Sequence, residues 1–106
     1  MRGVIKGVLA EELRNSRRMK VRYEAELRRL PKGCIVAKKI KGHRYYYLVQ
    51  RDGGHVRYAY KGIMTDGELR KYREAKLYRA KYRKLLSQVK KQIKFLRSSL
   101  RGKEAI

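Results

Sequence analysis

The chain contains one proline, Pro31, and this residue constrains the fold more than any other. A residue that precedes proline is pushed out of the α region, so a helix that approaches Pro31 has to end there. The segment before it has helical periodicity, with successive positions four and three residues apart: Leu9, Leu13, Ser16, Lys20, Tyr23, Leu27 and Leu30. The sequence therefore predicts an N-terminal tail over residues 1–7 and a helix over residues 8–30.

The segment that follows, residues 34–61, predicts a three-stranded antiparallel sheet. Its strand-forming runs at 35–40, 44–51 and 56–61 are separated by glycine-containing turns. A loop of two or of three residues after Ile40 decides which face of the first strand points inward, and the sequence leaves both open.

A two-residue Asp52-Gly53 loop would set the register of the second and third strands. It places on one face the pairs Val49 with Val56, Tyr47 with Tyr58, and Tyr45 with Tyr60. We expect the four tyrosines of this face to pack in the core. The opposite face is then open, and it carries Arg44, Tyr46, Leu48, Gln50, Arg57, Ala59 and Lys61.

The C-terminal part predicts a long helix over residues 66–100. Thr65-Asp66-Gly67-Glu68 resembles a capping box at its start. A strict coiled-coil heptad follows, formed by Tyr82, Leu86, Val89, Ile93, Leu96 and Leu100. A helix of this length spans on the order of 50 Å and would overhang the first helix. We therefore expect the heptad to be a protein interface, for a partner or for a homodimer.

These elements predict one α+β domain over residues 1–106. The helix, the three-stranded antiparallel sheet and the long C-terminal helix would form an antiparallel helical hairpin capped by the sheet.

The charge of the chain indicates its partner. There are 31 Lys and Arg against 9 Asp and Glu, a net charge of +22, and no acidic residue between Ala75 and Lys103. A polyanion relieves such self-repulsion, so we expect DNA or RNA to bind, with an anionic membrane as the second candidate.

No apolar run approaches the roughly 18 residues of a membrane span. Because a lone thiol cannot form an internal disulfide, Cys34 gives no sign of an oxidising compartment, and we expect a cytoplasmic location.

Eight residues are the predicted nucleic-acid contacts. Phosphates would be bound on the long helix by Arg73, Lys81, Lys84 and Lys91, and the sheet would contribute Arg44, Tyr46, Arg57 and Lys61.

Catalysis is not expected. His43 and His55 lie at turns and have no acidic or thiol companion at a metal-ligand spacing, so neither a metal nor a cofactor is predicted. Cys34 beside either histidine would lack an oxyanion donor, and we expect the thiol to be buried at the start of the first strand.

Several short segments carry a resemblance: Leu30-Pro31-Lys32-Gly33, Lys38-Lys39-Ile40-Lys41-Gly42, Tyr45-Tyr46-Tyr47-Leu48, Arg51-Asp52-Gly53-Gly54 and Tyr60-Lys61-Gly62. The pattern resembles small uncharacterised prokaryotic proteins and the start of some transposase-like proteins. Three short strands followed by a helix also resemble the arm-type DNA-binding domain of phage integrases. The resemblance covers roughly residues 30–75 and implies a mobile-element context.

Two alternative functions fit the same sequence. The chain could be a phage or mobile-element protein that inhibits or modulates a nucleoprotein enzyme, such as a CRISPR effector, with the heptad as its docking surface. It could also be a ribosome-associated protein whose basic helix lies against RNA.

Overall fold

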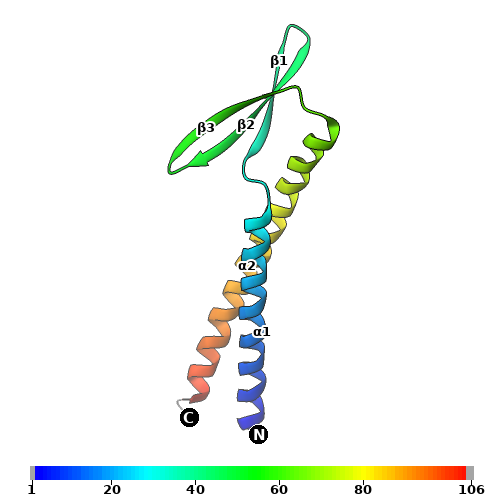
Figure 1. Cartoon of the computed structure of the whole chain (residues 1–106). Coiled ribbons are helices and arrows are strands. Elements are labelled where there is room, and N and C mark those ends of the chain that lie inside the picture. The colour runs from blue at the N-terminus through cyan, green and yellow to red at the C-terminus, as the bar shows by residue number, and fades with distance from the viewer. Residues whose placement is uncertain (1, 105–106) are drawn as a thin grey trace. The chain divides into compact units, whose positions relative to one another are not determined.

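The structure is a computed structural model that describes residues 2–104. The chain has an α+β fold in which a helix, a three-stranded antiparallel sheet and a long helix follow one another (Figure 1). The elements are α1 (Arg2–Arg29), β1 (Cys34–Ile40), β2 (His43–Asp52), β3 (His55–Gly62) and α2 (Asp66–Glu104).

The chain divides into two compact units. The hairpin unit contains residues 1–29 and 80–106, and the sheet unit contains residues 30–79. Helix α2 is continuous and contributes its first turns to the sheet unit and the rest to the hairpin unit.

Helix α1 begins at Arg2, so the predicted tail over residues 1–7 is wrong for the described part of that segment. Gly3 and Gly7 lower helix stability by about 1 kcal/mol each but do not forbid the helical conformation, and no proline interrupts the segment. The end of α2 also extends beyond the prediction, to Glu104, so the first turns of α1 have a helix to lie against. The start of α1 and the end of α2 lie at the same end of the hairpin unit, as an antiparallel pair requires (Figure 1).

The core of the hairpin unit is the predicted helical stripe. Leu13 is 8% exposed, Val89 3% and Leu96 5%. The rings of Tyr23 and Tyr82 meet across the two helices with their centroids 6.1 Å apart. Ser16 is 1% exposed, and its hydroxyl has no hydrogen-bond partner among the described residues.

This packing occupies part of the heptad within the chain, and the predicted protein interface stays a prediction. Val89 and Leu96 are buried, while Tyr82, Leu86, Ile93 and Leu100 are half-buried. Because α1 starts six residues earlier than predicted, it extends along this part of α2 and covers the heptad within the chain itself.

The sheet has strand order β1-β2-β3, with two-residue loops at both turns. Ile40 pairs with His43 across Lys41-Gly42, and Asp52 pairs with His55 across Gly53-Gly54. All four loop residues have positive φ, the conformation that the right-handed twist of a hairpin favours.

The predicted register of β2 and β3 is wrong by two residues. Tyr47 pairs with Tyr60 and Val49 with Tyr58, because the loop is Gly53-Gly54 and not Asp52-Gly53. Glycine adopts positive φ without steric cost, so the two adjacent glycines take both loop positions. A shift of two residues preserves the faces, and the four tyrosines still share one side of the sheet.

The prediction of which face is covered is also wrong for Tyr58 and Tyr60, which are 69% and 61% exposed. The covered face is the opposite one, where Leu48 is 7% exposed. Residues of this face and of the first turns of α2 line one hollow, and Ala75 of α2 is 2% exposed. A leucine buries its whole side chain without losing a hydrogen bond, whereas a tyrosine keeps its hydroxyl in water, which explains the choice of face.

Two local features fix the sheet unit. Gly33 has a φ of 98°, and a Cβ there would lie 2.8 Å from the Val49 carbonyl oxygen. Arg79 of α2 donates a hydrogen bond of 2.5 Å to the carbonyl oxygen of Pro31.

Thr65 caps α2 as predicted, since its Oγ1 accepts a hydrogen bond of 3.2 Å from the Glu68 amide.

Candidate nucleic-acid interface

The hairpin unit contains a hollow of about 450 Å³ that is lined almost wholly by cationic side chains. Its lining residues are Lys20 of α1 and Lys90, Ile93, Lys94, Arg97 and Arg101 of α2. We call this the cation groove. Its four cationic positions on α2 are spaced four, three and four residues apart, so helical geometry places them on one face.

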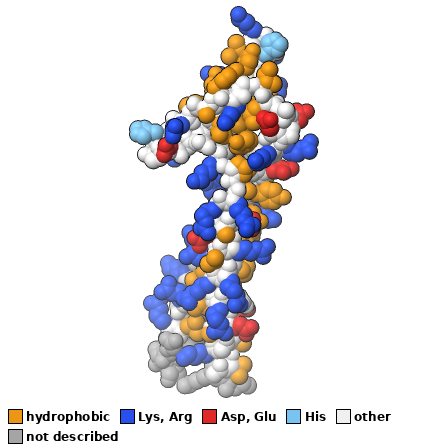
Figure 2. Space-filling model, viewed as in Figure 1, with side chains coloured by type: hydrophobic (Ala, Val, Ile, Leu, Met, Phe, Trp, Pro, Cys, Tyr) orange, Lys and Arg blue, Asp and Glu red, His pale blue; other side chains and the backbone are white. Residues whose placement is uncertain are grey.

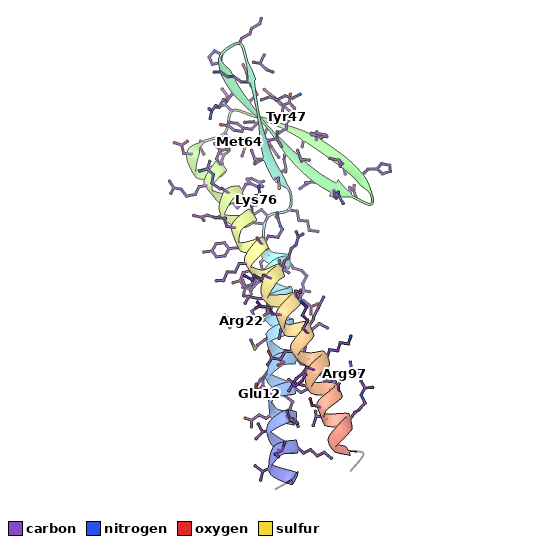
Figure 3. The ribbon with its side chains drawn as sticks, turned by 180° about the vertical axis from the view of Figure 1, so that it is seen from behind. Glu12, Arg22, Tyr47, Met64, Lys76 and Arg97 are labelled. Atoms are coloured by element: carbon purple, nitrogen blue, oxygen red, sulfur yellow. The ribbon has the colours of Figure 1, made fainter. Side chains whose placement is uncertain are left out.

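Within residues 3–102, whose side chains the structure describes, the cations of the groove form no ion pair. The ion pairs found there are Arg29 with Glu26 and Arg57 with Asp52, and neither involves the groove. Lys90, Lys94, Arg97 and Arg101 are exposed, and Figure 3 labels Arg97 on α2. Figure 2 shows the Lys and Arg side chains that cover the visible face of the helices. An anion in the groove would therefore meet several unpaired positive charges at once.

The predicted phosphate contacts Lys81, Lys84 and Lys91 all lie exposed on α2 in the hairpin unit, outside the lining of the groove. The Nζ of Lys81 lies 5.7 Å from the ring centroid of Tyr82. The sequence analysis placed these predicted contacts on the helix that carries most of the groove, but it did not identify the cations that line the groove. The spacing of positions 90, 94, 97 and 101 could have revealed it, because it is a helical stripe of cations beside the apolar heptad.

In the sheet unit, three predicted contacts come together. Arg44 and Tyr46 of β2 and Arg73 of α2 line a second hollow of about 450 Å³, together with Lys76. Asp66 also lines it, so its positive charge is partly offset. Figure 3 labels Lys76 on the first turns of α2.

The remaining two sheet residues lie apart from this hollow. Arg57 is exposed on β3 and donates a hydrogen bond of 3.0 Å to Asp52. The Asp52 carboxylate thereby partly neutralises the Arg57 charge. Lys61 is exposed at an irregularity of the register, where Tyr46 pairs with Gly62 and Tyr47 with Tyr60. This bulge leaves Lys61 without a direct cross-strand partner.

The side of the sheet opposite Leu48 carries the surface that the sequence prediction placed in the core. We call it the open tyrosine face and define it by Tyr45, Tyr47, Tyr58 and Tyr60 with Lys38 and Arg51, which the strand register places on the same side. The ring centroids of Tyr47 and Tyr60 are 5.3 Å apart, and those of Tyr45 and Tyr60 are 6.4 Å apart. The position of Leu48 could have shown which face is covered, because it is the one leucine of the three strands.

Other candidate chemistry is not brought together. Cys34 is exposed, so the expectation that it is buried is wrong; it lies at the first residue of β1, beyond the end of α1. His43 and His55 begin β2 and β3. Within residues 2–104, no three His, Cys, Asp or Glu side chains are grouped so that they could hold a metal ion.

In the described part of the chain, neither helix is both long enough and apolar enough to cross a membrane. Comparison with protein-family models, with curated proteins and with solved structures found no match to this chain.

Proposed function

We propose that this chain is a non-catalytic nucleic-acid-binding protein whose helical hairpin supplies the contacts to phosphate groups. The cation groove is the observation that carries the proposal: five Lys and Arg side chains line one hollow, and none of the carboxylates that the structure describes lines it. Nucleic acid is the polyanion that a cytoplasmic protein meets most often, and its phosphates are bound by such side chains.

The energetics of α2 support the same function. Lys90 with Lys94 and Arg97 with Arg101 are like-charged pairs four residues apart, and each destabilises a helix by about 0.2–0.5 kcal/mol. A helix with a solely structural role would gain stability by alternating the signs of these charges. Bound phosphates would remove the repulsion, so the cost in the free protein is consistent with a binding surface.

The test is a titration of fluorescently labelled DNA and RNA at a series of salt concentrations. We expect the logarithm of the affinity to fall steeply and linearly with the logarithm of the salt concentration. Replacing Lys90, Lys94 and Arg97 with Gln should reduce the magnitude of the slope by about 2 to 3, since each phosphate contact contributes about 0.7 to 0.9.

The matched control replaces Arg14, Arg17 and Arg22 with Gln. These three cations are exposed on α1 and do not line the groove, so the net charge falls equally. A smaller change in slope than for the groove variant supports the proposal. Equal changes would remove the role of the groove, and an absence of salt-dependent binding to either polymer would overturn the function.

A further inference from the structure

We infer that the open tyrosine face binds the unpaired bases of single-stranded nucleic acid by stacking; the inference rests on the proposed function and names its substrate. Tyr58 and Tyr60 are 69% and 61% exposed, and tyrosine is enriched at binding interfaces because its ring is apolar while its hydroxyl is polar. Val36, Ile40 and Val56 are also exposed on this side of the sheet, at 44%, 47% and 49%. Several exposed apolar side chains thus share this side of the sheet, and exposed apolar surface of this kind is typical of interaction sites.

The arrangement of the rings suits bases. The Tyr47 and Tyr60 rings are tilted by 60° to each other at a centroid distance of 5.3 Å, within the range at which aromatic rings attract. This contact orients the Tyr60 ring while most of its surface stays in solvent. Proteins that bind single strands use such fixed rings on a sheet as platforms for bases.

The spacing of the rings favours an unpaired strand over a duplex. Tyr58 and Tyr60 are two residues apart on β3, so their backbone positions are separated by about 6.8 Å. Bases along one strand of a duplex are separated by about 3.4 Å. Neighbouring bases would therefore have to separate to about twice the duplex spacing to stack on both rings. A single strand can extend in this way, whereas a duplex would have to lose its own stacking.

The charges beside the rings fit the same ligand. The Nζ of Lys38 lies 5.6 Å from the Tyr47 ring centroid, and Arg51 lies on the same side of the sheet at the far end of β2. The segment 34–51 contains no acidic residue, and the register places Asp52 on the opposite side. Rings flanked by cations complement a strand of bases and phosphates. A second copy of this chain would instead bring another net charge of +22 to the face.

The test compares a 12-nucleotide oligothymidylate with a duplex of the same length. In the double variant Tyr58→Ala with Tyr60→Ala, affinity for the single strand should fall by about 30-fold or more, because loss of a base–ring stack lowers affinity about 5- to 150-fold. Affinity for the duplex should change less than about twofold. The double variant Tyr58→Phe with Tyr60→Phe keeps both rings and should bind the single strand within about twofold of the parent protein.

Two controls keep the result interpretable. Tyr78→Ala removes a tyrosine that is 48% exposed on α2, outside the sheet, and should leave the preference for the single strand unchanged. A second measurement needs no variant: the parent protein is photocrosslinked to an oligonucleotide that contains 5-bromodeoxyuridine, and the modified residues are mapped. Crosslinks at Tyr58 or Tyr60 support the inference, and crosslinks confined to the helices overturn it.

The outcomes separate this inference from the proposed function. Salt-dependent binding of both polymers, with no effect of the alanine variants on the single strand, overturns stacking and leaves the nucleic-acid function intact. Loss of self-association in those variants at unchanged affinity would assign the face to a second copy and also overturn stacking. Failure to bind any nucleic acid removes both proposals together.

Discussion

The hairpin unit and the sheet unit use their large side chains in opposite ways. In the hairpin unit, Leu13, Val89 and Leu96 are buried and the cations lie outside. In the sheet unit, Leu48 and Ala75 are buried while Tyr58 and Tyr60 lie in solvent. The hairpin unit thus exposes mainly cations, whereas the sheet unit exposes tyrosine rings as well as cations. Under the proposals above, the first would contact phosphates and the second would also contact bases.

The largest expected effect on the free energy of unfolding comes from replacing Gly33 in the sheet unit. In Gly33→Ala, the new Cβ would meet the Val49 carbonyl oxygen at 2.8 Å and the Leu48 Cδ1 at 2.9 Å, with φ at 98°. Backbone strain and overpacking together should lower the free energy of unfolding by about 4 kcal/mol. Urea denaturation followed by circular dichroism measures the loss. The control is Gly42→Ala, where φ is 83° but nothing lies within 4 Å, and it should lose only about 1 to 2 kcal/mol. Equal losses would refute the steric argument.

The next effect tests the core of the hairpin unit. Leu96 is 5% exposed, so Leu96→Ala should lower the free energy of unfolding by about 3 kcal/mol through lost burial and the cavity left behind. Its neighbour Phe95 is 68% exposed, and Phe95→Ala should change the free energy by less than about 0.5 kcal/mol. The same denaturation measurement applies to both. A large loss for Phe95→Ala with a small one for Leu96→Ala would show that the heptad faces outward and serves a partner.

The element order could be predicted from the sequence because the local signals are strong. Pro31 marks the end of α1 within two residues, the glycine turns separate the strands, and Thr65 caps α2. These signals act over a few residues and do not depend on the rest of the fold. The start of α1 was missed because Gly3 and Gly7 weaken a helix locally, whereas tertiary packing decides whether it continues.

The polyanion surface that the charge indicates stays a prediction. For the sheet, the sequence showed that the tyrosines cluster on one face, which the register bears out. Period-two alternation shows which residues share a face, but it does not show which face a helix will cover. That depends on the packing of α2, whose Leu69 and Tyr72 line the hollow beside Ile35 and Tyr46. Within the strands, the position of Leu48 is the one local signal of this long-range packing.

A smaller effect tests Ser16, a buried polar residue of the hairpin core. The Ser16 hydroxyl is buried without a hydrogen-bond partner among the described residues. Ser16→Ala removes a desolvated hydroxyl and should raise the free energy of unfolding by about 1 kcal/mol. Because alanine also has the higher helix propensity, the control is Ser87→Ala at an exposed position of α2, which should gain only about 0.3–0.5 kcal/mol. A gain no larger than that of the control would show that the hydroxyl is satisfied in solution.

The smallest effect on stability separates folding from binding in the hairpin unit. Lys90→Glu replaces a repulsive pair with Lys94 by an attractive one four residues apart, and should raise the free energy of unfolding by about 0.5 kcal/mol. The same change removes a cation from the groove and should weaken nucleic-acid binding. Thermal denaturation and the salt titration measure the two consequences.

The matched control for Lys90→Glu is Arg22→Glu, at a position labelled on α1 in Figure 3. Arg22 lies four residues from both Arg18 and Glu26, so reversing its charge exchanges one attractive pair for another and leaves stability nearly unchanged. Both variants lower the net charge by two. If Lys90→Glu is more stable and binds more weakly than Arg22→Glu, then the cations of the groove are retained for binding at a cost to the fold. If the two variants bind equally, affinity depends on total charge and the groove has no special role.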